Sequence, residues 1–96
     1  MKLVWTKKAQ RRLGEILDYI EKEFGATARQ SFRDKARDFT RVLIEFPEMG
    51  AIEIKEKNLR GFQLTKQTRV FYRARKDTIV ILTLFDSRQS PKKRPK

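Results

Sequence analysis

The spacing of the apolar residues changes near Gly50, and this change limits the folds open to the chain. Before Gly50, apolar residues recur every three to four positions, which is the period of amphipathic helices. After Gly50 the period becomes two, as in strands whose successive side chains point to opposite faces of a sheet. We therefore expect helices in the first half of the chain and an antiparallel sheet in the second.

Two helices joined by a short connection are expected in the first half. Thr6 caps the first helix, and Gly25 stops it, as glycine just past a helix end often does. Thr27 and Gln30 match a capping box that starts the second helix, which ends at Pro47. A connection of about two residues makes the helices antiparallel. Their apolar stripes are Ala9, Leu13, Ile16, Leu17, Ile20 and Phe24, then Ala28, Phe32, Ala36, Phe39, Leu43 and Phe46.

Strands are expected on both sides of this helical hairpin. Residues 3–5 read as a short first strand, and short alternating runs follow Gly50 around Ile52 and Phe62. The last two strands meet at Lys76 and Asp77, and the second of them is almost uniformly apolar, as a buried strand is. The first of the two carries one set of side chains on each face: Arg69, Phe71, Arg73 and Arg75, opposite Val70, Tyr72 and Ala74.

The predicted fold class is α+β. It has an N-terminal strand, an antiparallel helical hairpin and three to four antiparallel strands that form one sheet, with the helices on one face. Residues 1–90 are expected to form a single domain, because a chain of 96 residues has room for one core. Residues 91–96, with two prolines and four cations, are predicted to be a mobile basic tail.

The composition narrows the possible functions. Twenty-four Lys and Arg against twelve Asp and Glu give a net charge of +12, which indicates a polyanionic partner, either nucleic acid or an acidic protein. Without cysteine or histidine, disulfides, thiolate chemistry and the commonest metal ligand are excluded, and we expect neither a metal nor a cofactor. We also expect no membrane segment and a location in the reducing cytoplasm.

A basic face is predicted near the C-terminal strands. Residues 60–90 hold seven Lys or Arg against Asp77 and Asp86, and the guanidinium fork of arginine binds phosphate and carboxylate. Phe71 either stacks on a base or packs beside the arginine stems. A solvated basic strand with no ligand is an equal alternative. The candidate binding residues are Arg60, Lys66, Arg69, Phe71, Arg73, Arg75 and Arg88.

RNA cleavage would need a proton-transfer group beside these cations. Arginine cannot serve, because its high pKa keeps it protonated, although Arg69 and Arg88 could stabilise a charged intermediate. Lys55 and Lys57, on one face of a predicted strand, are the candidate catalytic bases, since neighbouring cations lower the pKa of a lysine. Glu56 is a further candidate, whereas Tyr72 shares the core face with Val70 and is expected to be packed.

Taken in order, several short motifs resemble the RelE/ParE superfamily of toxins from type II toxin–antitoxin pairs, often known as plasmid stabilisation proteins. The motifs span nearly the whole chain. They are Leu3-Val4-Trp5, Tyr19-Ile20-x-x-x-Phe24-Gly25, Phe46-Pro47-x-Met49-Gly50, Arg60-Gly61-Phe62, Arg69-Val70-Phe71-Tyr72-Arg73 and Leu84-Phe85-Asp86-Ser87-Arg88-Gln89.

The resemblance implies a growth-inhibiting toxin that an antitoxin from the same operon neutralises in a hetero-oligomer. The antitoxin is expected to be acidic where it binds, and to wrap the domain with a helix or strand that covers the basic face. Members similar to ParE poison DNA gyrase, whereas members similar to RelE cleave mRNA on the ribosome. A third possibility is an inactive member that binds only its antitoxin.

The chain keeps only part of the RelE-like pattern. That pattern places arginines at Arg69 and Arg88, but it also requires lysines where this chain has Gln63 and Thr65. It further requires a tyrosine near the C-terminus, where this chain has only Arg94, and the histidine-using relatives place theirs near Ser87. Unless a shift of register brings Lys55, Lys57 or Lys66 into place, the proton-transfer groups are missing. The ParE-like activity is therefore favoured, with the ribonuclease as the alternative.

Overall fold

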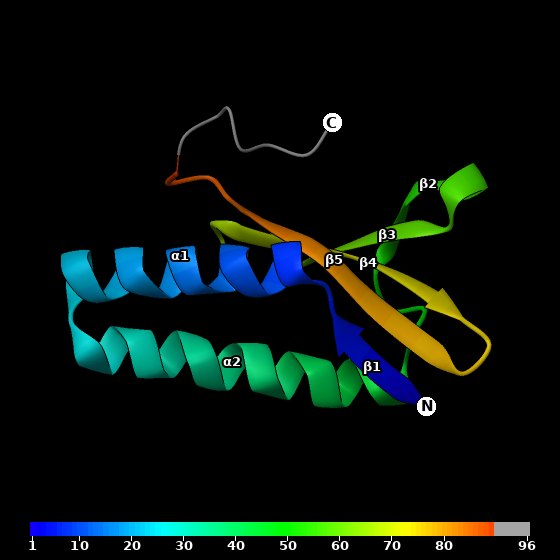
Figure 1. Ribbon diagram of the computed structural model, residues 1–96, viewed down its shortest axis with the longest axis horizontal. Coiled ribbons are helices and arrows are strands. Elements are labelled where there is room, and N and C mark those ends of the chain that lie inside the picture. The colour runs from blue at the N-terminus through cyan, green and yellow to red at the C-terminus, as the bar shows by residue number, and fades with distance from the viewer. Residues whose placement is uncertain (90–96) are drawn as a thin grey trace.

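The computed structural model describes residues 1–89, so the tail predicted at 91–96 lies outside the described residues. Figure 1 shows a helical hairpin packed on one face of a sheet, which confirms the predicted α+β fold. No helix within residues 1–89 is long and apolar enough to cross a membrane. The elements are β1 (Lys2–Trp5), α1 (Lys7–Phe24), α2 (Ala26–Glu45), β2 (Ala51–Ile54), the 3₁₀ helix η1 (Lys55–Lys57), β3 (Leu59–Gln63), β4 (Thr68–Arg75) and β5 (Thr78–Asp86).

The sheet has five strands in the order β1-β5-β4-β3-β2. Strands β2 to β5 pair antiparallel, as predicted, and they give the upper number of the three to four strands expected. β1 adds a parallel edge strand beside β5, with Leu3 opposite Ile79, so the sheet is mixed. A parallel pair needs a long connection between its strands, and the helical hairpin and the intervening strands supply it.

Thr6 fixes the start of α1 against the sheet. Its hydroxyl oxygen accepts a hydrogen bond from the Ala9 amide at 3.0 Å, which confirms the predicted cap. The same hydroxyl donates to the Leu82 carbonyl of β5 at 2.9 Å. Leu82 forms a bulge in β5: Thr83 pairs with Phe71 and Ile81 pairs with Tyr72, so Leu82 has no partner residue on β4. Thr6 therefore fixes both the N-terminal end of α1 and the bulge at Leu82 in β5.

The turn between the helices is shorter than predicted. Gly25 alone separates α1 from α2, and its φ of 97° is a conformation that glycine adopts at little cost. The capping box predicted at Thr27 is wrong, because α2 has already begun at Ala26 and has no side-chain cap. The Gln30 amide donates instead to Asp34 at 2.9 Å, within the helix.

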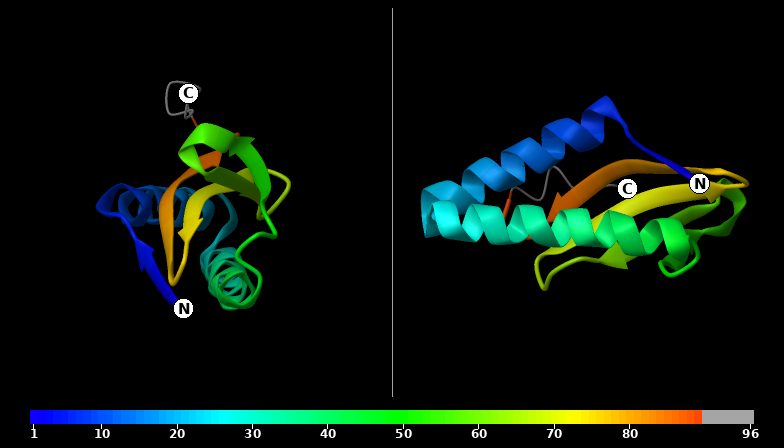
Figure 2. Two further views of the ribbon diagram at one scale, coloured as in Figure 1. Left: turned by 90° about the vertical axis from the view of Figure 1, so that its right-hand side faces the viewer. Right: turned by 90° about the horizontal axis from the view of Figure 1, so that it is seen from below.

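One hydrophobic core lies between the hairpin and the sheet, and α1 crosses β5 (Figures 1 and 2). The last residue of each predicted apolar stripe does not belong to the core, because Phe24 and Phe46 are 61% and 60% exposed. The turn end of the helical hairpin, where α1 ends at Phe24, extends past the sheet (Figure 1). The buried apolar residues are Ala9, Ile16, Leu17, Ile20, Phe32, Ala36, Phe39, Leu43, Val70, Tyr72, Ile79, Ile81 and Leu84.

Candidate functional site

The face of the sheet that points away from the helices carries the basic residues of β4. Val70 and Tyr72 are buried beneath the hairpin, whereas Arg69, Phe71 and Arg73 alternate with them and are partly exposed. The predicted two-faced pattern of β4 is therefore confirmed. Residues paired across neighbouring strands share a face, so this outer face also includes Leu59, Gly61 and Gln63 of β3, and Val80, Thr83 and Phe85 of β5.

Arg69 is held by partners on β3 and, one strand further across the sheet, on β2. Its guanidinium forms an ion pair with Glu53 of β2 and donates a hydrogen bond to the Gln63 side chain at 3.2 Å. It also lies 5.9 Å from the centre of the Phe71 ring. The bare surface of Gly61 makes room for the ion pair, because a Cβ atom there would lie 2.8 Å from both the Arg69 Nε and a Glu53 carboxylate oxygen. Arg69 is thus occupied, and Phe71 packs beside it.

Arg73 differs from Arg69 in having no acid beside it. Its Nε is buried and has no hydrogen-bond acceptor among residues 1–89. No carboxylate in the same part of the chain lies within ion-pair distance of Arg73 or of the exposed Arg75. A buried donor without an acceptor costs free energy, and the Arg73 residue that carries it is itself partly exposed on the outer face. Arg73 is the best-placed cation on this face to receive a partner.

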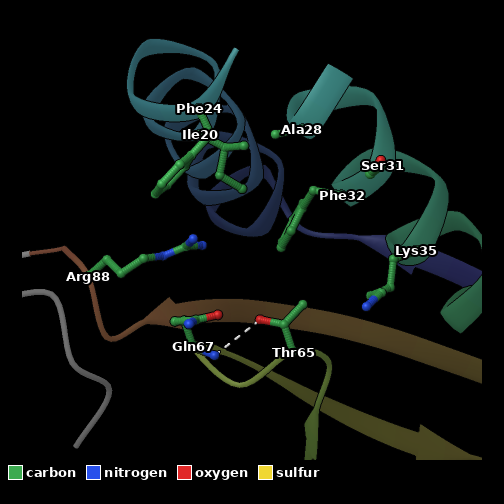
Figure 3. Close-up of a pocket in the computed structure, with 9 residues that line it drawn as sticks. All are labelled: Ile20, Phe24, Ala28, Ser31, Phe32, Lys35, Thr65, Gln67 and Arg88. Atoms are coloured by element: carbon green, nitrogen blue, oxygen red, sulfur yellow. Dashed lines mark hydrogen bonds between the residues drawn. The ribbon is translucent and has the colours of Figure 1, made fainter. Parts of the chain in front are cut away.

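Arg88 lies on the other side of the sheet, where Asp86 holds it. Two of its guanidinium nitrogens, Nε and Nη2, donate to the Asp86 carboxylate at 2.9 and 2.6 Å, and its guanidinium lies over the Tyr19 ring of α1. The Thr68 hydroxyl donates to the same carboxylate at 2.7 Å. Burial acts to raise the pKa of Asp86, but the hydrogen bonds from Arg88 and Thr68 outweigh it and hold this pKa below its ordinary value. Figure 3 shows the Arg88 side chain reaching toward Ile20 of α1.

The structure does not bring the two candidate catalytic arginines together. Arg69 is anchored to β2 on the outer face, and Arg88 points toward α1 on the helix face. Each also has a carboxylate partner. A scissile phosphate held by both guanidinium groups would need them on one surface.

The strand predicted to carry Lys55 and Lys57 ends before them. Both lie in η1 and are exposed, because the chain turns at Asn58, which has a φ of 51°. The Asn58 side-chain amide donates to the Ala74 carbonyl at 2.6 Å and fixes this turn. Lys66 is exposed in the loop between β3 and β4. The placement of Lys55 and Lys57 on one face of a strand is therefore wrong.

Arg60 lies apart from the basic outer face to which it was assigned. It is paired in register with Tyr72 and so points to the helix side, where it donates to the carbonyls of Glu48 and Gly50 at 3.1 and 2.7 Å. Tyr72 is packed, as expected: its hydroxyl donates to the Pro47 carbonyl and accepts from the Gly50 amide. Burial raises the pKa of Tyr72, which makes it a poor general base.

Two charged residues of the core were not singled out from the sequence. Arg12 is 5% exposed; it donates to the Leu84 carbonyl at 3.2 Å and pairs with Glu15 at 3.0 Å. Its place between Ala9 and Leu13 on the apolar stripe was the available signal. Asp86, fully buried, directly follows the apolar run of β5, and this marks the end at which the strand turns. Within residues 1–89, no group of three carboxylates could hold a metal ion.

The fold and the site define a class of small basic proteins in which a helical hairpin covers one face of a mixed sheet and the other face carries arginines. The sequence model of one protein family, described as the ParE toxin of the type II toxin–antitoxin system parDE, matches residues 3–91. This chain therefore belongs to the ParE toxin family, within the RelE/ParE superfamily that its motifs resembled.

Solved structures support the same fold. A chain from the chromosomal ParDE toxin–antitoxin system of P. aeruginosa is 22% identical with a TM-score of 0.74, and the match covers 90% of this chain and 95% of that one. The YoeB/ParE toxin of Agrobacterium tumefaciens is 16% identical with a TM-score of 0.61, over 90% and 98% of the two chains. No curated protein sequence matches this chain.

Proposed function

We propose that this type II toxin arrests growth by binding and poisoning DNA gyrase, and not by cutting RNA. One observation carries the proposal. Arg69 and Arg88, which a RelE-like nuclease would use together, lie on opposite faces of the sheet and are each paired with a carboxylate. A toxin that acts by binding needs neither a shared phosphate site nor a general base. Because the proposed target is a cytoplasmic enzyme, we place the toxin in the cytoplasm.

The outer face of the sheet has the character of a protein-binding surface. It combines the cations Arg73 and Arg75, which pair with no carboxylate within residues 1–89, with partly exposed apolar side chains, among them Phe71 and Phe85. Protein interfaces are enriched in arginine and aromatic residues that exclude water from a central patch. We assign gyrase to this face, with a carboxylate of the target paired to Arg73.

The ribonuclease remains the second candidate, and the same face favours it in one respect. An unpaired arginine beside an aromatic ring is also how proteins hold single-stranded RNA. Cleavage would also need a general base on the outer face, whereas the predicted bases Lys55 and Lys57 lie in η1.

Purified components test the choice between the two targets. We expect the chain to inhibit supercoiling of plasmid DNA by purified gyrase and to leave ribosome-bound mRNA intact. Arg73→Glu should weaken the inhibition by about tenfold or more, as loss of a central interface cation does. Arg33→Glu, an equal charge change on the exposed surface of α2, is the control and should retain inhibition. Cleaved mRNA together with unaffected supercoiling would contradict the proposal.

A further inference from the structure

Cations from several segments gather at one end of the sheet. Figure 1 shows the start of β1, the turn between β4 and β5, and η1 at this end, away from the turn between the helices. Two hydrogen bonds join these segments: the Lys2 amide donates to the Asp77 carbonyl at 2.7 Å, and Asn58 beside η1 donates to the Ala74 carbonyl. We call this region the basic end. Its cations are Lys2, Lys55, Lys57, Arg60, Arg75 and Lys76.

The carboxylates around the basic end do not neutralise it. Glu48, Glu56 and Asp77 lie among its six cations, and no ion pair within residues 1–89 joins any of these nine residues. Arg29, at the turn between the helices, instead pairs with two carboxylates of α1. An anionic surface can therefore approach the basic end without breaking an internal ion pair.

A small hollow lies within the basic end. Its volume is about 150 Å³, and Arg60, Arg75 and Lys76 line it together with Glu48. The Arg60 guanidinium is held in place, because one of its nitrogens donates to the carbonyls of Glu48 and Gly50. A cation that is already held loses little conformational freedom when an anion binds. The hollow thus suits a phosphate group, which would meet three cations and one carboxylate there.

Lys76 has a backbone conformation that lysine rarely adopts. Arg75 and Thr78 pair across the two strands, so Lys76 and Asp77 form a two-residue turn, in which Lys76 has a φ of 34°. Glycine, asparagine and aspartate are the common residues at such a position of a hairpin turn. Residues held at unfavourable backbone angles cluster at sites that hold a ligand. The turn therefore supports a binding role for the charge at its tip.

The dimensions and composition of the basic end match a nucleic acid duplex. From β1 to β3 it crosses three strand spacings, or about 14 Å, and a DNA duplex carries about eight phosphates over that length. None of the residues 1–89 that line the hollow is aromatic. Aromatic side chains are what protein interfaces and single-stranded nucleic acids use, since unpaired bases stack on them. A duplex, whose bases are already stacked, needs only the cations.

We propose that the basic end binds the phosphate backbone of double-stranded DNA without regard to its sequence. The choice of DNA rests on the proposed function, because gyrase holds a DNA duplex while it acts. Arg75 follows Arg73 on the same face of β4, so the basic end adjoins the outer face that we assign to gyrase. The toxin would then contact the enzyme with one surface and the DNA of the same complex with the next.

Two double variants test the site. Lys57→Glu combined with Lys76→Glu reverses two charges at the basic end. Lys22→Glu combined with Arg33→Glu makes the same change in net charge on the helices, away from the basic end. All four residues are exposed, so both variants are expected to fold, and thermal unfolding checks this. If the change in the turn destabilises the fold, Lys2→Glu, at an exposed residue of β1, takes the place of Lys76→Glu.

The affinity of each variant for a short fluorescent DNA duplex of mixed sequence is measured by anisotropy, without gyrase, at several salt concentrations. We expect the basic-end variant to bind at least about tenfold more weakly than the wild type, and the helix variant to stay within about threefold. The slope of log affinity against log salt should become shallower by about two in the basic-end variant, because each phosphate contact contributes about 0.9. Equal losses in the two variants would overturn the proposal, as would a basic-end variant that binds like the wild type.

Two further readouts separate this inference from its alternatives. Tighter binding to an RNA duplex or to single-stranded RNA of the same length would overturn the assignment to DNA. The basic-end variant should also bind purified gyrase without DNA as the wild type does, and a loss of that binding would show that the basic end contacts the enzyme instead.

The inference and the proposed function can fail separately. A wild-type toxin that binds DNA through the basic end but does not inhibit supercoiling would refute the gyrase proposal alone. A toxin that inhibits gyrase but whose DNA affinity does not depend on Lys57 and Lys76 would refute the inference alone.

Discussion

At the scale of single residues, the end of β5 is organised around one buried carboxylate. Asp86 accepts hydrogen bonds from Thr68, from the Arg88 guanidinium and from the Arg88 amide at 2.9 Å. These contacts hold Arg88 over Tyr19, where it also lines a hollow between the helices and the loop before β4. The RelE-like ribonuclease alternative expected Arg88 to stabilise a phosphate, and here its immediate contacts close the strand end against α1.

The lowered pKa of Asp86 predicts a stability that depends on pH. Because the pKa of the folded state lies below that of the unfolded chain, the carboxylate stabilises the fold above about pH 4, and this contribution is lost as the pH falls through the folded value. Asp86→Asn should lower the free energy of unfolding at pH 7 by about 1–3 kcal/mol. Urea unfolding at pH 7 and pH 3 measures the effect.

The difference between Asp86→Asn and the wild type should shrink as the pH falls from the unfolded pKa of Asp86 toward its lowered folded pKa, because the stabilisation by the wild-type carboxylate is lost over that range. Asp38→Asn, at an exposed residue of α2, is the control and should change stability little at either pH. A difference that is the same at both pH values would contradict the account of Asp86.

At the scale of elements, the helix starts depend on different devices. α1 starts at a side-chain cap that also bonds the sheet, whereas α2 starts at the backbone of Gly25. Thr6→Ala should therefore lower the free energy of unfolding by about 1–2 kcal/mol, as the loss of an N-cap does. Thr27→Ala, at the exposed residue of the rejected capping box, should stay within about 0.5 kcal/mol. Denaturant unfolding of both variants decides this, and equal losses would contradict it.

The elements that the sequence predicted well are those with long apolar patterns. The alternation of β4 and the apolar run of β5 indicated the two central strands, because burial on one or both faces fixes such patterns. The misassigned positions lie where a single residue decides the backbone. Gly25 shortened the turn before Thr27. The left-handed Asn58 closes the short helix η1 that replaces the predicted strand at Lys55 and Lys57, and neither effect is visible in a pattern of polarity.

The candidate site was predicted less well than the fold, for a reason of geometry. A list of arginines shows net charge, but the face on which each one lies depends on strand register and on the turn after the strand end. Arg60 and Arg69 lie on opposite faces of the sheet, because Arg60 is paired in register with the inward-facing Tyr72. Arg88 lies beyond the end of β5, where its hydrogen bonds to Asp86 direct it toward the helices. The predicted basic face therefore divides into an outer surface around Arg73 and contacts on the helix side.

At the scale of the whole molecule, the toxin presents two separate surfaces. The outer face of the sheet carries Arg73, which pairs with no carboxylate within residues 1–89, and the two hollows beside α2 are lined by the exposed apolar residues Phe24 and Val42 together with Lys35 and Arg88. The net charge of +12 favours acidic surfaces at both.

The central claim is that this toxin acts by binding gyrase and does not cleave RNA. Its most direct test is to induce the chain without its antitoxin and to pulse-label newly made DNA and protein in the same culture. The account predicts that DNA synthesis falls first, with an SOS response, while cellular mRNA stays intact. An early stop of protein synthesis, with mRNAs cut at codons, would contradict it.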